Sequence, residues 1–195
     1  MLTPGPAVGD PDALVAALIE VDRHVGRNGW DTPPRLFALV LNDVLAAAEP
    51  QLSAELAAGA GVQGGRLPSC EPHTTGAGAE PGALTAIEQD EFASSGDLTS
   101  DLAHLEWPES VYGCALAAVR IFLPSDADTE LPADPEAAAA AVGQHPQRQE
   151  IRVVVGADRA GNRHGVARLA AQPEELLGAP DLVPGLAAAL AHTLS

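Results

Sequence analysis

The sequence predicts a single α+β domain over residues 1–195, with a mainly antiparallel sheet of about four strands flanked by N-terminal and C-terminal helices. Three observations lead to this fold class. The chain has 195 residues, which is the length of one domain. Apolar residues recur at helical spacing near both ends and at alternate positions between them. Late in the chain only a short turn separates two β segments, which favours hairpin connections over parallel winding.

The first helix is predicted from a cap, an apolar stripe and a stop signal. Asp10 and Pro11 are a capping residue and a proline suited to the first helical position, and Gly26 ends the helix. The stripe recurs at helical spacing over Leu14, Leu18, Val21 and Val25. Residues 35–41 follow two prolines and predict the first strand, and Asn42 caps a second helix.

Residues 57–82 predict a flexible surface loop. Gly, Ala, Pro and small polar residues dominate this stretch, so it buries too little apolar surface to offset the entropy of ordering it. Directly after it, Thr85 and Glu88 have the spacing of a capping box. This pair predicts a short helix that begins near Ala83.

The second half of the chain predicts a core strand, a hairpin and a closing helix. Residues 111–123 are apolar on both faces of a strand, so we expect this strand to be central and covered on both sides. The elements in order are a helix at 98–105, this strand, an Ala-rich helix opened by Asp134 and closed by Gly143, a hairpin of 151–155 and 163–169, and a helix at 181–194.

Charge and apolar runs exclude several classes of partner. The net charge of −17 disfavours nucleic acids and anionic membranes, because both attract Lys and Arg. The sequence has no run of about 18 apolar residues and no signal-peptide pattern. Cys70 and Cys114 form no paired or ligand-like motif. We therefore expect a cytoplasmic protein that binds neither membranes nor nucleic acids.

The sequence contains no catalytic, metal-binding or cofactor-binding motif. No Ser lies in a G-x-S-x-G elbow, and the clustered glycines near residue 61 precede no Lys. The six histidines are scattered one per element, without ligand spacing: His24, His73, His104, His145, His164 and His192. We therefore predict no catalytic residue, no metal ligand and no cofactor.

Basic residues gather on the predicted hairpin. Five arginines and His164 lie between residues 148 and 168, where Glu150 and Asp158 are the only acids. In the predicted pairing, Arg152 and Arg168 lie on one sheet face, with His164 in phase with Arg168. Guanidinium groups on one face suit a carboxylate or a phosphate, so these three residues are a candidate anion or partner site. The alternative is that the arginines pair with the chain's own surplus of acids.

Several segments resemble a family of actinobacterial proteins with no assigned activity. They are Gly29–Asp31, Pro33–Val40, Thr85–Asp90, Trp107–Glu109, Gly113–Leu116 and Asp181–Leu186. The resemblance spans the chain except residues 57–82 and implies a lineage without site residues. The order of elements is also similar to small secretion-chaperone-like α+β folds, in which a dimer receives a partner peptide. Fold alone does not carry function.

Two functional hypotheses follow. The first is a noncatalytic, protein-binding or chaperone-like module, homodimeric, that presents a sheet face and a helix groove to a protein or peptide. The alternative is a small-molecule or anion-binding protein, or an enzyme, that uses the face with Arg152, His164 and Arg168. A deep pocket with convergent polar groups favours the alternative, and a flat sheet face favours the first hypothesis.

Overall fold

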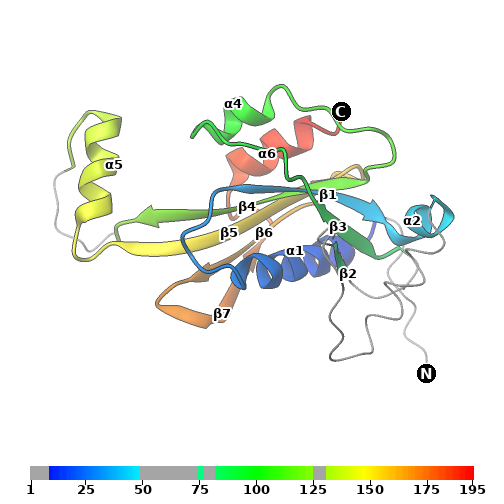
Figure 1. Ribbon diagram of the computed structural model, residues 1–195, viewed down its shortest axis with the longest axis horizontal. Helices are drawn as coiled ribbons and strands as arrows, with labels where there is room; N and C mark the ends of the chain where they lie inside the picture. Colours follow the sequence, from blue (N-terminus) through cyan, green and yellow to red (C-terminus); the bar gives the residue numbers. More distant parts are fainter. Residues whose placement is uncertain (1–8, 49–73, 77–81, 125–130) are drawn as a thin grey trace.

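The structure, a computed structural model, describes residues 9–48, 74–76, 82–124 and 131–195 (Figure 1). Its helices are α1 (Pro11–Gly26), α2 (Asn42–Ala48), α4 (Leu98–Leu102), α5 (Pro135–Gln144) and α6 (Pro184–His192). Its strands are β1 (Arg35–Leu41), β2 (Thr74–Gly76), β3 (Leu84–Glu88), β4 (Gly113–Phe122), β5 (Gln149–Asp158), β6 (Arg163–Leu169) and β7 (Gln172–Ala179). These strands form one sheet in the order β2-β3-β1-β4-β5-β6-β7, and every neighbouring pair is antiparallel.

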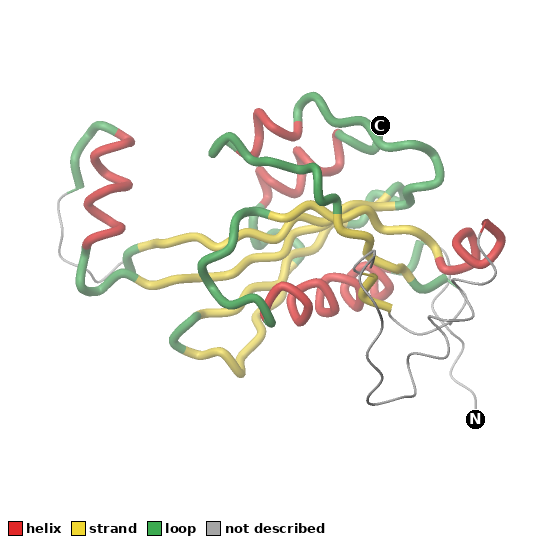
Figure 2. The backbone as a smooth tube through the Cα atoms, viewed as in Figure 1, coloured by secondary structure: helices red, strands yellow, loops and turns green. Residues whose placement is uncertain are grey.

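Helices cover both faces of the sheet. Helix α1 lies on one face, and α4 and α6 lie on the other, so a separate apolar core forms on each side (Figures 1 and 2). The predicted α+β class, with a mainly antiparallel sheet between N-terminal and C-terminal helices, is therefore confirmed. The prediction of about four strands is wrong, because β2, β3 and β7 join the four strands that the sequence indicated.

Helix α1 begins and packs as its sequence predicts. The Asp10 carboxylate accepts a hydrogen bond from the Asp12 backbone N–H at 3.0 Å, which caps the helix. Leu14 and Leu18 are fully buried against the sheet. A Cβ atom at Gly156 of β5 would lie 2.7 Å from Leu18 Cδ2. The missing side chain at Gly156 therefore allows α1 to approach the sheet closely.

Strands β4 and β5 run on past the helices that cover the sheet and form an arm. Strand β4 is buried from Gly113 to Ala118, which confirms the predicted central strand. Past Val119, residues 120–122 pair with residues 149–151, and we call these six residues the arm; β6 pairs with the arm only at Ile151. Helix α5 stands at the end of the arm, away from the helices on the body (Figure 1). Ile121 of the arm is 45% exposed, so apolar residues of β4 continue beyond the part of the strand that the helices cover.

Residues 84–88 form strand β3, so the helix predicted from the capping box is wrong. Backbone pairing with β1 on one side and β2 on the other fixes the extended conformation. The Thr85 hydroxyl donates to Asn42 Oδ1 at 2.6 Å instead of capping a helix. The Glu88 carboxylate lies between His24 Nε2, at 3.1 Å, and Arg35 Nη1, at 3.3 Å. Both side chains of the expected capping box thus have partners distant in sequence.

Two further differences concern strands at the sheet edges. Strand β2 lies inside the stretch 57–82 that was predicted to be a loop, while residues 57–73 and 77–81 of that prediction lie outside the described residues. Strand β7 was not predicted, because Leu176 and Leu177 are adjacent and give no alternation. It is mostly exposed and carries Glu174 and Glu175, as suits an edge strand that must not pair further.

Candidate functional site

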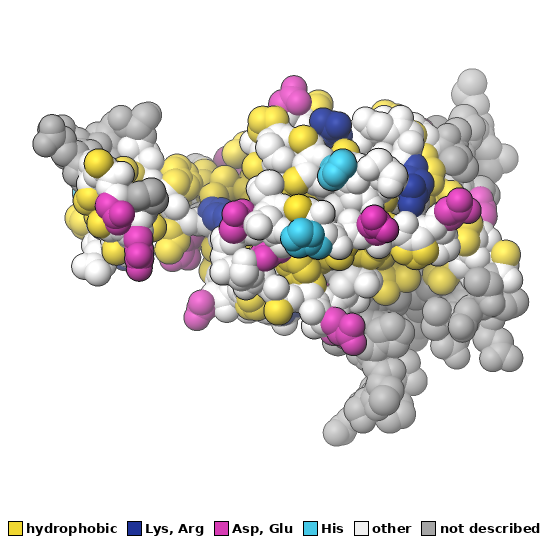
Figure 3. Space-filling model, turned by 90° about the horizontal axis from the view of Figure 1, so that it is seen from above, with side chains coloured by type: hydrophobic (Ala, Val, Ile, Leu, Met, Phe, Trp, Pro, Cys, Tyr) yellow, Lys and Arg dark blue, Asp and Glu magenta, His cyan; other side chains and the backbone are white. Residues whose placement is uncertain are grey.

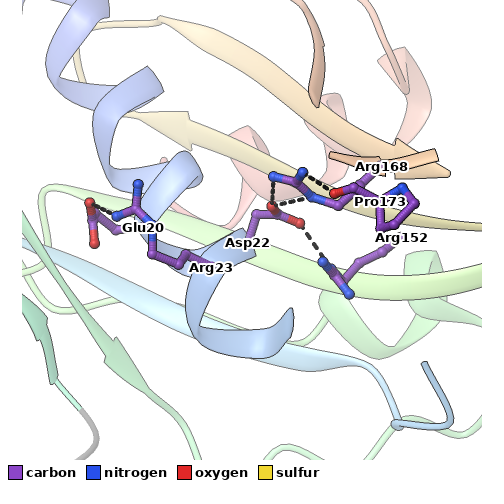
Figure 4. Close-up of polar contacts among 6 residues, drawn as sticks. All are labelled: Glu20, Asp22, Arg23, Arg152, Arg168 and Pro173. Atoms are coloured by element: carbon purple, nitrogen blue, oxygen red, sulfur yellow. Dashed lines mark hydrogen bonds and ion pairs between the residues drawn. The ribbon is translucent and has the colours of Figure 1, made fainter. Parts of the chain in front are cut away.

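Arg152 and Arg168 share one face of the sheet, as the sequence predicts; they lie opposite each other, and the face is the one that α1 covers. Both contact the carboxylate of Asp22 on α1 (Figure 4). Arg152 Nε lies 2.9 Å from Asp22 Oδ1, and Arg168 Nη2 lies 2.8 Å from Oδ2. The exposed fractions of the side chains are 2% for Asp22, 5% for Arg152 and 20% for Arg168. One buried carboxylate therefore forms ion pairs with two guanidinium groups beneath α1.

Further contacts make this cluster a tie between α1 and the sheet. The Arg152 guanidinium carbon lies 4.7 Å from the centre of the Trp30 ring, in a cation–π contact. Arg168 also donates to the carbonyl oxygen of Pro173 at the start of β7. Sequence reasoning missed Asp22 as the partner. The available signal was its spacing, because an acid in phase with Leu14 and Leu18 must point into the core.

His164 lies on the same face of β6 but is not part of the cluster. It pairs with Gly156, four residues along the strand from Arg168, which is a separation of about 13 Å. A Cβ atom on Gly178 of β7 would lie 3.3 Å from His164 Nε2. An anion site formed by Arg152, His164 and Arg168 remains a prediction. The observed ion pairs match the alternative stated with it, internal pairing, for its two arginines.

The opposite face of the sheet carries an open apolar hollow of about 630 Å³, which we call the trough. It lies between the arm and the first residues of α4 and α6. Its floor is buried and consists of Leu98, Ala118 and Val153. Half-buried apolar side chains form its walls: Ile151, Leu182, Val183 and Leu186. Figure 3 looks down on this side and shows hydrophobic side chains along the connection between α5 and the body.

Few polar groups border the trough. The exposed Arg120 donates to the carbonyl oxygen of its own neighbour Val119 at 3.3 Å. Asp97 caps α4 by accepting hydrogen bonds from the backbone N–H groups of Thr99 and Ser100 at 3.1 and 3.2 Å. An apolar lining with a single cation at the edge suits the binding of an apolar group.

A second hollow of about 670 Å³ lies on the other side of α4. Its aromatic side chains are Phe92 and Trp107, and the Trp107 indole N–H donates to the Thr193 hydroxyl at 3.0 Å. Asp101 accepts hydrogen bonds from Ser94 and Ser95, which lower the pKa of its carboxyl group. Glu91, His104 and Glu106 also line this hollow, so its lining is more polar than that of the trough, and the trough is the better candidate for an apolar ligand.

Within the described part of the chain, no three His, Cys, Asp or Glu side chains are placed to hold a metal ion. None of the described helices has the length and apolarity needed to cross a bilayer.

Comparison with known proteins identifies the family but not an activity. No curated protein matches the chain, and no solved structure matches it. A family model described as PPA1309-like protein matches residues 14–195, and the chain therefore belongs to the family of PPA1309-like proteins.

Proposed function

We propose that the protein is a noncatalytic binding module of the cytoplasm whose trough receives an apolar segment of a partner protein. The observation that carries this proposal is the construction of the trough. Its floor is a buried apolar surface, and its walls are four large apolar side chains left half open to solvent. A surface of this kind gains roughly 25 cal/mol for each Å² of apolar area that a ligand covers.

The shape of the trough favours a short segment with two or three large apolar anchors. Two of the floor residues, Ala118 and its cross-strand partner Val153, have short side chains, which suits close approach by the larger side chain of a ligand. Peptides that dock in apolar grooves commonly supply such anchors from one face of a helix. Arg120 at the edge suits an acidic residue beside the anchors. The net charge of −17 favours a partner that is neutral or basic overall.

The test selects binders from a phage-displayed library of random dodecapeptides against the full chain. We expect the selected peptides to be rich in Leu, Ile, Phe and Trp. Their affinity should fall at least about tenfold for Leu186→Glu, which places a charge in the trough wall. Leu177→Glu is the matched control, because Leu177 is 48% exposed on β7 and lies outside the trough. Equal affinities for both variants, or selection of peptides without apolar anchors, would contradict the proposal.

A further inference from the structure

Helix α5 is only partly packed against the rest of the described chain. It carries six consecutive apolar residues, Ala137–Val142, and these surround the helix because 3.6 residues complete a turn. None of these six residues is buried among the described residues: α5 contacts β4, with Ala138, Ala141 and Val142 half-buried, and the other three are exposed. A helix that is apolar on all sides is normally buried, and an isolated helix of ten residues is marginal in water. Its position at the end of the arm therefore calls for cover from another molecule.

The chain itself offers a surface of the matching kind. Helix α5 and the pair α4 and α6 rise from the same face of the sheet, α5 at the outer end of the arm and α4 and α6 over the body (Figures 1 and 2). The trough lies on the side of α6, and no residue of α5 lines it. Alanine side chains allow a helix to approach an apolar surface closely. One copy of the chain thus presents both a convex apolar helix and an open apolar hollow.

Charge supports a match between the two surfaces. The exposed first turn of α5 carries Glu136, and its cap is Asp134. Arg120 is the cation at the edge of the trough, and the Asp97 carboxylate at the same edge already accepts hydrogen bonds from the backbone N–H groups of Thr99 and Ser100. A helix seated in the trough with its first turn toward Arg120 brings opposite charges together. This local match opposes the general repulsion between two copies that each carry a charge of −17.

We propose that two copies form a twofold dimer in which α5 of each copy lies in the trough of the other. This inference rests on the proposed function, because it assigns an occupant to the same trough. With twofold symmetry, α5 of each copy covers the trough of the other, so both helices and both troughs are covered. A contact between one trough and an unrelated protein would leave α5 exposed. In this dimer α5 of the second copy blocks the trough, so a segment of a partner protein must compete with α5 to bind there.

The experiment measures self-association of the full chain by sedimentation velocity across the micromolar range. We expect a dimer for the wild type, and at least about a tenfold weaker association for Ala139→Glu on α5 and for Leu186→Glu in the trough. Ala139 is exposed and Glu is a good helix former, so the variant chain keeps its fold. Ala16→Glu adds the same charge to an exposed site on α1 and should leave the dimer intact. Circular dichroism verifies that each variant is folded.

A mixture of the two weakened variants tests reciprocity. The Ala139→Glu chain has an intact trough and the Leu186→Glu chain has an intact α5, so one of the two contacts survives in a mixed dimer. The mixture should therefore associate more tightly than either variant alone. A wild type that stays monomeric, or a dimer unaffected by Ala139→Glu, would overturn the inference, and so would a mixture no tighter than its components.

Peptide binding separates this inference from the proposed function. The Ala139→Glu chain should bind the selected apolar dodecapeptides at least as tightly as the wild type, because its trough is vacant. If Leu186→Glu abolishes peptide binding while Ala139→Glu leaves the dimer unchanged, the proposed function stands and the dimer model fails. If the dimer responds as expected but no apolar peptide is selected, the dimer model stands and the proposed function fails.

Discussion

Replacing Asp22 with Asn removes the carboxylate shared by Arg152 and Arg168 and leaves the size of the side chain unchanged. Removing one partner of a buried ion pair costs about 3 to 5 kcal/mol, because the other charge stays buried without compensation. Arg152 is 5% exposed and bears most of this penalty. Arg168 is 20% exposed and keeps its bond to the Pro173 carbonyl, so it loses less. We expect a loss of about 3 to 5 kcal/mol, a large part of a typical domain stability of roughly 5 to 15 kcal/mol.

Urea-induced unfolding of the full chain measures this loss, because the midpoint shifts while the slope stays unchanged. Glu20→Gln on the same helix is the matched control. Its ion pair with Arg23 has side chains that are 30% and 58% exposed, and such surface pairs contribute about 0 to 1 kcal/mol. A second variant, Asp22→Asn with Arg152→Met, should recover part of the loss, because it also removes the uncompensated charge. If Asp22→Asn costs no more than Glu20→Gln, the cluster does not hold α1 to the sheet and the reasoning is refuted.

Two more predictions concern the core. Gly156→Ala places a Cβ atom 2.7 Å from Leu18 and should lower the free energy of unfolding in urea by about 1 to 3 kcal/mol. As the control, Gly143→Ala meets no atom within 4 Å and should raise that free energy by about 0.5 to 1 kcal/mol. Equal effects of the two substitutions would show that α1 does not pack closely on β5. Burial raises the pKa of the Cys114 thiol from 9.0 to about 11. In a Cys70→Ser variant, native Cys114 should therefore resist a disulfide reagent at pH 8, and rapid modification would contradict its burial. The folded state favours the neutral Cys114 thiol, so the free energy of unfolding includes a contribution from this preference that is complete below pH 9 and is lost as the pH rises toward 11. Urea titrations at several pH values measure this loss.

The elements that sequence reasoning located correctly depend on local chemistry. Asp10 and Asp134 both cap helices by accepting bonds from backbone N–H groups two and three residues ahead. In β5, alternation between Arg152 and its apolar neighbours located the strand and placed Arg152 on the same face as Arg168 of β6. Capping and alternation act over a few residues, so a single segment contains all the information needed.

The wrong element, β3, depends on partners far away in sequence. Thr85 and Glu88 satisfy the local rule for a capping box, but backbone pairing with both β1 and β2 outweighs that preference. Intrinsic propensity amounts to a few tenths of a kcal/mol per residue, and a set of ladder hydrogen bonds exceeds it. The same limit applies to β7, where pairing with β6 orders a segment without an apolar pattern.

The candidate sites show the same division. The position of Arg152 and Arg168 on one face was predictable, but their partner Asp22 lies 130 and 146 residues away in the sequence. The trough was not predictable, since its lining comes from four separated segments that converge only in the folded chain. Alternation shows which residues share a face, and it contains no information on what covers that face.

The two faces of the sheet therefore differ: the α1 face is closed by packing, and the opposite face leaves apolar surface open. On the α1 face, apolar packing against Gly156 and the ion cluster at Asp22 close the surface, so substitutions there should change stability. On the other face, β4 and β5 run on beyond α4 and α6, and apolar side chains such as Ile151 remain half open. A sheet surface of this kind gains free energy only when something covers it. The chain places a half-exposed apolar helix at the end of the same two strands, so the extension of β4 and β5 produces both the open surface and the proposed occupant of that surface. In the dimer proposed above, shortening the arm by a matched pair of residues on each strand brings α5 nearer its own body, and it should therefore weaken self-association measured by sedimentation velocity.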